Sequence, residues 1–397
     1  METYKSLVVK KNKTGPINNF HPWVFSRAIL EIPEGLIPGE PVRLYDENKR
    51  FLGLGYFNSY SLITVRIWGY NETETVDLDF FKKRIKHAYE IRKRFVETQE
   101  TNAFRIINGE NDLLPGLIVD KYGEYVVMQI HTKGMDKWKN EIIQSLIEVI
   151  RPKGIYERSD MHMRESEGLE LSNKLLFGDI PDLIQIKENG LKFIVDIRHG
   201  QKTGFFLDQR DKRYAFMKYA KDRSVLNCFS YTGGFSIYAL AGGANKVINI
   251  DTSEDALELA RENVLINGFN PNKCSFLKMD VKDYLKENKE QFDAIVLDPP
   301  AFIKDRKKIN EGKVGYKIIN EFALKSLKED GILLTCSCSA HLKMEDFRYL
   351  LVEAAGKAQK HLKILETFTH GIDHLQGISF LEGSYLKCII TTIYKGF

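Results

Sequence analysis

The stretch SVLNCFSYTGGFSIYALAGG, Ser224 to Gly243, contains the pattern that decides the fold. It opens with an apolar run, SVLNCFS, of the kind found in strands that are buried on both faces. A turn that ends in two glycines follows, and then a helical run, FSIYALAGG. Because a buried strand followed by a helix is the repeating unit of parallel sheets, the stretch predicts an α/β domain around itself.

The alternation of strand and helix continues towards the C-terminus. Strand-like runs begin at 246, 274, 292 and 331, and helical runs begin at 253, 281 and 313. The run SYLKCIITTIY adds a final strand, and a hairpin-like segment, LIQIKENGLKFIVDI, precedes the series. We therefore predict that residues 191–397 form a Rossmann-like α/β domain, with a mostly parallel sheet covered by helices.

Two smaller regions precede this domain. Residues 1–70 contain short strand-like runs such as EPVRLYD and LITVRIWGY between glycine and proline turns, which predicts a small β-barrel or sandwich. Residues 71–190 contain two amphipathic helical runs, DLDFFKKRIKHAYEIRKRF and WKNEIIQSLIEVI, and a hairpin that turns at KYGE. This second region is predicted to be a central α+β domain.

The N-terminal region is locally basic. Residues 1–27 contain a single acid, Glu2, and these basic residues: Lys5, Lys10, Lys11, Lys13 and Arg27. The aromatic stretch HPWVFS, His21 to Ser26, overlaps the end of that segment. Such a surface could meet a phosphate backbone. The alternative interpretation is a solvated arm followed by a tryptophan, Trp23, that anchors a small core.

Composition narrows the classes of function. The chain has 397 residues and a net charge of +4, which allows two or three domains and argues against a wholly basic nucleic-acid coat. No apolar stretch approaches the length that spans a membrane. The five cysteines are scattered and odd in number, so they predict a reducing, cytoplasmic compartment and no disulfide framework.

Three acids mark a cofactor pocket. Asp251, Asp280 and Asp298 each end a predicted strand of the α/β domain, where ligands of such sheets bind. The turn FSYTGG, with Phe229, Tyr231 and Gly233, lets the backbone approach a ligand but lacks the dinucleotide fingerprint G-x-G-x-x-G. S-adenosylmethionine (SAM) has no phosphate and needs no such turn. Asp251 could accept the ribose hydroxyls and Asp280 the adenine amino group; the alternative is that these acids only cap helices.

The motif DPPAF, Asp298 to Phe302, predicts a site for a planar base. Pro299 and Pro300 fix the backbone and stop strand pairing. A carboxyl group, a rigid turn and the aromatic ring of Phe302 could then hold a flat nitrogenous ring by its edge and face. The alternative interpretation is a strand-terminating turn with a core phenylalanine.

Two cysteines, Cys336 and Cys338, lie in the next strand-like run, GILLTCSCS. Cys338 is closer to the predicted strand mouth, where a thiol can ionise, whereas Cys336 should be packed and inert. A thiolate that adds to C6 of a pyrimidine activates C5 for methylation, which methylation of a nitrogen does not require. Cys338 is therefore the candidate nucleophile, with core filler as the alternative. No metal site is predicted, because His341 and this cysteine pair do not complete four ligands.

The whole chain resembles the bacterial ribosomal RNA large-subunit methyltransferase I family. These are SAM-dependent 23S ribosomal RNA cytosine-C5 methyltransferases with an N-terminal PUA domain. The matching segments, in order, are HPWVFS, DLLPGLIVDKYG, IYERSD, DIRHGQKTGFFLDQRD, VLNCFSYTGGFS, IDTSEDAL, FDAIVLDPPAF, GYKIIN, GILLTCSCS and EGSYLK.

The resemblance implies roles for particular residues. Residues 1–70 would be a PUA-like RNA-binding barrel, with RNA contacts at Lys10, Lys11, His21 and Trp23. The segment GFFLDQR would join the SAM pocket through Phe206 and Asp208, and the SCS motif assigns the nucleophile to Cys338. The partner would be 23S ribosomal RNA, and the oligomeric state stays open, a homodimer being one option. Two other functions remain: an RNA methyltransferase with another base or atom as target, or a non-catalytic assembly factor that binds SAM and RNA.

Overall fold

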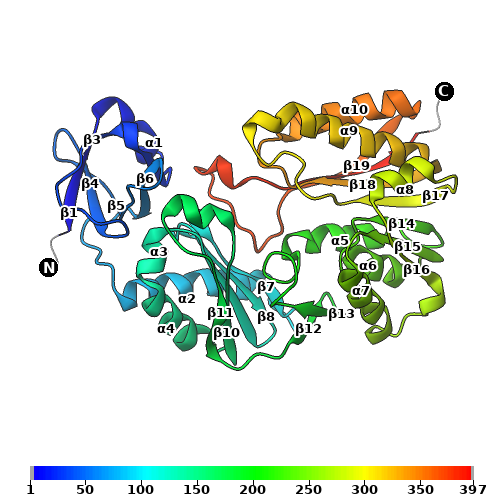
Figure 1. The fold of residues 1–397 in the computed structure, drawn as a ribbon, viewed down its shortest axis with the longest axis horizontal. Helices are drawn as coiled ribbons and strands as arrows, with labels where there is room; N and C mark the ends of the chain where they lie inside the picture. The colour runs from blue at the N-terminus through cyan, green and yellow to red at the C-terminus, as the bar shows by residue number, and fades with distance from the viewer. Residues whose placement is uncertain (1–3, 395–397) are drawn as a thin grey trace. The chain divides into compact units, whose positions relative to one another are not determined.

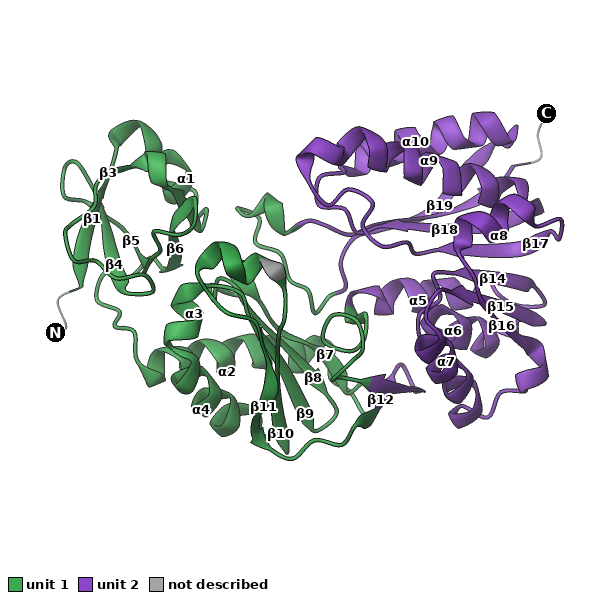
Figure 2. Ribbon diagram, in the orientation of Figure 1, with its two compact units in different colours: residues 1–184, 196–207, 372–383 green, residues 185–195, 208–371, 384–397 purple. Residues whose placement is uncertain are grey.

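The computed structural model describes residues 4–394. The chain divides into two compact units, coloured separately in Figure 2. The first unit comprises the residues up to 184 together with 196–207 and 372–383, and the second comprises 185–195, 208–371 and 384–397. Within residues 4–394, no helix has the length and apolar character needed to cross a membrane.

The N-terminal part of the first unit is built on a six-stranded sheet (Figure 1). Its strand order is β2-β6-β5-β4-β1-β3, with bounds β1 Lys5–Val9, β2 Trp23–Phe25, β3 Ile29–Glu31, β4 Pro41–Asp46, β5 Phe51–Phe57 and β6 Ile63–Gly69. The pair β1–β4 is parallel and the other neighbours are antiparallel. A short helix, α1 (Gly15–Asn18), lies within the basic segment, after Lys13.

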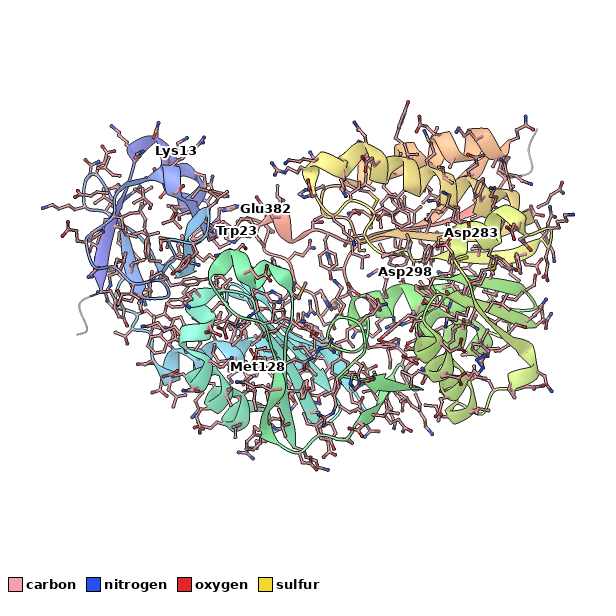
Figure 3. All side chains as sticks on the ribbon, in the orientation of Figure 1. Lys13, Trp23, Met128, Asp283, Asp298 and Glu382 are labelled. Carbon is pink, nitrogen blue, oxygen red and sulfur yellow. The ribbon has the colours of Figure 1, made fainter. Side chains whose placement is uncertain are left out.

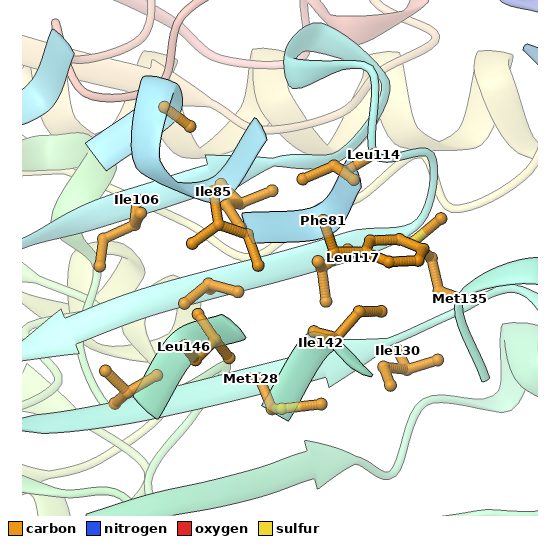
Figure 4. Close-up of a cluster of buried hydrophobic side chains, with 14 of the residues drawn as sticks. Phe81, Ile85, Ile106, Leu114, Leu117, Met128, Ile130, Met135, Ile142 and Leu146 are labelled. Atoms are coloured by element: carbon orange, nitrogen blue, oxygen red, sulfur yellow. The ribbon is translucent and has the colours of Figure 1, made fainter. Parts of the chain in front are cut away.

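The central part of the first unit places two long helices against a second sheet. The strand order is β11-β10-β9-β8-β7, with bounds β7 Ala103–Asn108, β8 Leu117–Tyr122, β9 Tyr125–Ile130, β10 Gly154–Ser159 and β11 Ser172–Gly178. The helices are α2 (Leu78–Phe95), α3 (Lys133–Lys137) and α4 (Lys139–Ile150). Figure 4 shows their shared core, where Phe81 of α2 and Ile142 of α4 meet strand residues such as Met128. The predicted hairpin is confirmed as β8–β9.

The second unit contains a seven-stranded sheet that is mostly parallel. Its order is β16-β15-β14-β17-β18-β20-β19, with bounds β14 Ser224–Cys228, β15 Lys246–Asp251, β16 Cys274–Lys278, β17 Phe292–Leu297, β18 Leu327–Ser337, β19 Leu362–Phe368 and β20 Lys387–Ile393. The strands β14 to β18 pair in parallel, and β20 is antiparallel to both of its neighbours. The strand order reverses at β14, so the loops after β14, β15 and β17 form a switch point where ligands bind in such sheets.

Helices alternate with the strands of this sheet, as the sequence predicts. They are α5 (Arg210–Met217), α6 (Gly234–Ala241), α7 (Glu254–Ile266), α8 (Val281–Glu287), α9 (Ile309–Lys325) and α10 (Met344–Ala358). The hairpin β12 (Leu183–Glu188) and β13 (Leu191–Asp196) precedes them. A buried bidentate ion pair joins this hairpin to α5, since Arg213 donates to Glu188 at 2.6 and 2.8 Å.

One connection of the second sheet belongs to the first unit. Residues 372–383, which we call the strap, join β19 to β20. The side chain of Arg92 donates to the carbonyl of Asp373 at 3.1 Å, and the Phe380 ring lies 4.8 Å from the ring of Trp23. Long-range hydrogen bonds and aromatic packing therefore fix the strap on the first unit.

Candidate active site

A cavity of about 790 Å³ opens at the switch point of the second unit. Its lining includes one predicted residue after each of four consecutive strands: Phe229 after β14, Asp251 at the end of β15, Asp280 after β16 and Pro300 after β17. Phe302 and residues of α9, apolar ones and Glu311, also line the cavity, together with lysines such as Lys304 and Lys308. A volume in this range suits a small-molecule cofactor, and its mixture of carboxylates and apolar surface suits a nucleoside.

The turn after β14 is held in an unusual backbone conformation. Phe229 and Tyr231 are non-glycine residues with φ of 58° and 47°, and Gly233 has φ of 75°. Such left-handed residues cost free energy and cluster where a ligand site requires a fixed backbone. Two buried hydroxyl oxygens of this turn, on Ser230 and Thr232, have no hydrogen-bond partner among the described residues. Phe229 is the residue of this turn that lines the cavity, so the fixed turn forms part of the cavity wall.

Asp251 and Asp280 both hold the local backbone and line the cavity. The two carboxylate oxygens of Asp251 accept the backbone N–H groups of Tyr231 and Ser253 at 2.8 and 3.0 Å. Asp280 caps α8 by accepting from the backbone N–H groups of Lys282 and Asp283 at 2.8 and 3.2 Å, through its Oδ1 atom. The alternative interpretation, that these acids cap helices, therefore holds for Asp280. A carboxylate can accept about four hydrogen bonds, however, and both groups line the cavity, so both can also bind a ligand.

Asp298 lies at the carboxyl end of β17 (labelled in Figure 3). Its Oδ1 accepts a hydrogen bond from the side-chain amide of Gln209 at 2.8 Å. Burial, reinforced by the negative charge of Asp208, raises the pKa of the Asp298 carboxyl to about 7. A carboxyl with that pKa is populated in both forms at neutral pH, so it can donate or accept a proton there.

The two cysteines at the end of the fifth parallel strand differ in burial, as predicted. Cys336 is fully buried in β18 and lies opposite Cys388 of β20. Burial, followed by its interaction with Cys388, raises the pKa of the Cys336 thiol well above its usual value. Cys338 lies one residue beyond the end of β18, is partly exposed, and has its Sγ 3.8 Å from the carbonyl oxygen of Pro299. The more accessible thiol therefore adjoins the DPP turn.

The remaining predicted cofactor residues lie in the segment before α5. Asp208 accepts a hydrogen bond from the hydroxyl of Tyr385 at 2.6 Å. Phe206 is partly buried and belongs to residues 196–207, which are part of the first unit. The roles of both residues in cofactor binding stay predictions.

The predicted RNA-binding residues take part in contacts within the first unit. Lys10 donates to the carbonyl of Arg27 at 3.1 Å, and Lys11 is exposed. The Nε2 atom of His21 lies 3.3 Å from a Glu382 carboxylate oxygen, and the Trp23 indole donates to Glu110 at 2.9 Å; Figure 3 labels Trp23 and Glu382. Trp23 is partly buried and contacts Glu110 and Phe380, and it is not part of the hydrophobic core of the N-terminal domain. Its role and that of His21 in binding RNA remain predictions.

Three residues at the site had not been singled out from the sequence. Gln209 bonds Asp298, Tyr385 bonds Asp208, and Lys387 is a buried lysine beside the cysteine motif. All three lie in the quoted segments GFFLDQR and EGSYLK, but nothing in those letters indicates which side chains point inwards. Among the side chains that the structure describes, which do not include that of His162, no group of His, Cys, Asp and Glu could hold a metal ion.

Comparisons with known proteins identify the domains of the chain. Residues 169–372 match the family model of S-adenosylmethionine-dependent methyltransferases, and residues 7–69 match that of PUA-like domains. Ribosomal RNA large subunit methyltransferase I of Alteromonas mediterranea is 39% identical, over 98% of this chain and 98% of that protein. The protein of the same name from Aeromonas salmonicida is 41% identical, over 93% of this chain and 94% of the relative.

Solved structures share the fold. A putative SAM-dependent methyltransferase from Streptococcus mutans superposes with a TM-score of 0.84 at 23% identity, over 98% of this chain and all of that chain. A putative methyltransferase complexed with SAH gives a TM-score of 0.85 at 24% identity over the same shares. The predicted fold class, with a PUA-like domain before a SAM-dependent methyltransferase domain, and the predicted cofactor are confirmed. The chain belongs to the ribosomal RNA large subunit methyltransferase I family.

Proposed function

We propose that this protein transfers the methyl group of SAM to C5 of a cytosine in large-subunit (23S) ribosomal RNA, through a covalent bond between Cys338 and C6. Its relatives are named for ribosomal RNA of the large subunit. The observation that carries the choice of C5 is the partly exposed Cys338 thiol, 3.8 Å from the Pro299 carbonyl of the DPP turn. Methylation of a nitrogen would not need a thiol there.

The proposed mechanism divides one hard step into easier ones. The Cys338 thiolate adds to C6, which makes C5 nucleophilic. SAM, when bound, supplies the methyl group that C5 takes up. A base then removes the C5 proton, the C5–C6 double bond re-forms, and the Cys338–C6 bond breaks to return the thiolate. The target base has to leave its stack or lie in an open strand to reach the thiol.

Asp298 would serve the same reaction from the edge of the base. Burial raises the pKa of its carboxyl to about 7, so a protonated form is available near neutral pH. In that form the carboxyl can donate a hydrogen bond to N3 of the cytosine as the ring gains electron density. Gln209 donates to the Oδ1 atom of this carboxyl, so the other oxygen would be the one that meets the base. The cavity residues Asp251 and Asp280 would hold SAM.

The N-terminal domain would hold the RNA. Its match to a PUA-like domain and the exposed Lys11 beside the partly buried Lys10 support this assignment. The exposed aromatic residues Phe20 and Phe25 are near them in sequence and offer stacking surfaces.

The test is to trap the adduct. A large-subunit ribosomal RNA transcript made with 5-fluorocytidine has no C5 proton to remove, so methylation should leave protein bound to RNA on a denaturing gel. We expect this species with the wild type and with Cys336→Ala, the matched control. Cys338→Ala should give none while still binding SAM. Methylation of ordinary RNA by Cys338→Ala would overturn the mechanism.

The same reagents separate the two other functions. Tritiated SAM and unmodified large-subunit RNA, followed by mapping of the labelled nucleotide, should place the label on C5 of cytosine. A label on another base or atom would favour a different RNA methyltransferase. Binding of SAM without any labelled RNA would favour an assembly factor.

A further inference from the structure

Lys387 is a buried lysine at the start of β20. Its side chain is 3% exposed, and its residue lies opposite Ser337 of β18 in the antiparallel register. The Nζ atom donates to the carbonyl oxygens of Ser339 and Tyr385, each at 2.6 Å. One of these carbonyls belongs to the residue directly after Cys338, so the ammonium lies beside the cysteine motif.

This ammonium lacks a negative partner. Both of its acceptors are neutral carbonyl oxygens, and among the described residues no carboxylate forms an ion pair with it. A buried charge without a counter-charge is costly, and proteins seldom keep one that has no use. Burial lowers the pKa of Lys387 to about 8, and Cys338 is the group that opposes this shift. Because about 8 is above neutral pH, the charged form still predominates.

We propose that Lys387 is a positioning residue that keeps Cys338 ready as a thiolate, by supplying the counter-charge to its sulfur. The thiol proton leaves to solvent, and the sulfur anion that remains is the negative partner that the buried ammonium lacks. The two carbonyl bonds fix the ammonium in place, so no side-chain reorganisation is needed when the charge forms. This inference rests on the proposed function, in which the Cys338 thiolate attacks C6.

Two other groups beside the thiol, the Tyr316 hydroxyl and the Pro299 carbonyl, carry no positive charge. The hydroxyl of Tyr316, from α9, interacts with Cys338 and is itself held by Ser339 at 2.9 Å. The carbonyl of Pro299, after β17, is an acceptor, and Asp298 beside it is an acid. The charges of Arg213 and Lys212, from α5, act on Asp298, whereas Lys387, from β20, interacts with Cys338 itself. Thiolates are stabilised by adjacent cations in other proteins, which lowers the thiol pKa.

The test measures the thiol without any RNA. The full-length protein is alkylated with iodoacetamide across a range of pH, and the peptide that carries Cys338 is quantified by mass spectrometry. In the wild type we expect the alkylation midpoint to lie below the usual thiol value of about 8.5. In Lys387→Met the midpoint should rise, and a rise of one pH unit would slow alkylation at pH 7 about tenfold. Lys387→Arg should restore much of the rate.

The control is Lys363→Met, which removes an exposed cation from β19 and should leave alkylation of Cys338 unchanged. Unchanged alkylation in a folded, SAM-binding Lys387→Met would overturn the inference. If Lys387→Met does not fold, the pH profile of Cys338 alkylation in the wild type is the test. A midpoint of that profile at or above about 8.5 would also overturn the inference. Failure of the proposed function is distinguishable, because it would abolish the 5-fluorocytidine adduct of the wild type while the dependence of alkylation on Lys387 persisted.

Discussion

Replacing Asp298 by asparagine should make the second unit more stable at alkaline pH. Burial and the charge of Asp208 raise the pKa of Asp298 from 3.8 to about 7 in the folded protein. The folded state therefore binds more protons than the unfolded state between those two values, and stability falls as the pH rises through that window. Asparagine removes this titration and can still accept the hydrogen bond that Gln209 donates.

The size of the effect follows from the two pKa values. A shift of about three units corresponds to roughly 4 kcal/mol in full. Between about pH 5.5 and about pH 8.5, the difference in stability between Asp298→Asn and the wild type should grow by about 2 kcal/mol. A difference of about 2 kcal/mol corresponds to about a thirtyfold change in the equilibrium constant for opening of the second unit.

Hydrogen exchange followed by mass spectrometry is a suitable assay, because it reports local opening of β14 and β17. Tryptophan fluorescence would not serve, since Trp23, Trp68 and Trp138 all lie in the first unit. Rates are corrected for the intrinsic effect of pH, and Asp283→Asn, which replaces an exposed carboxylate on α8, is the matched control. Protection curves for Asp298→Asn and wild type that run parallel with pH would refute the reasoning.

Three further predictions concern stability and cofactor binding. Arg213→Met leaves the buried carboxylate of Glu188 unpaired and should lower the free energy of unfolding by about 3–5 kcal/mol, as measured by urea denaturation. Gly134→Ala places a Cβ atom 2.3 Å from the ring of Tyr56, so it should cost about 1–3 kcal/mol and lower the melting temperature. Asp280→Ala removes the cap of α8, costing about 1 kcal/mol, and should weaken SAM binding in calorimetry.

Each of these predictions has an outcome that contradicts it. A double variant, Arg213→Met with Glu188→Gln, should recover part of the loss; no recovery would mean that the pair's charges are not the cause. A melting temperature of Gly134→Ala equal to that of the wild type would show that the Tyr56 ring moves aside without cost. Unchanged SAM affinity in Asp280→Ala would leave that residue with its capping role alone.

The strand–helix alternation of the second unit was predictable because each element carries its own local signal. Buried strands such as β14 and β17 are continuous apolar runs, and the residues that follow them are set at the sheet edge by topology. Asp251, Asp280 and Pro300 could therefore be placed at one cavity from their position alone. The difference between the two cysteines also followed from their distance to the strand end.

Other features have no local signal. The strand β19 was not predicted, because it lies at the edge of the sheet and its exposed face carries charged and apolar residues together. The burial of Lys387 depends on carbonyl groups brought in by folding, so nothing distinguishes it from the other lysines of the sequence. The attachment of Phe380 to Trp23 joins residues far apart in the chain and leaves no periodic pattern.

The strap gives the protein an unusual genetic constraint. The polypeptide passes from one unit to the other five times, at 184, 195, 207, 371 and 383. A recombination breakpoint at 184, 195, 207 or 371 would take the strap and the surface it packs on from different parents. Phe380, which is 7% exposed, would then pack on a surface that had not evolved with it. We expect such chains to diverge by substitutions along their whole length. We do not expect the second unit to be exchanged between proteins as a separate domain.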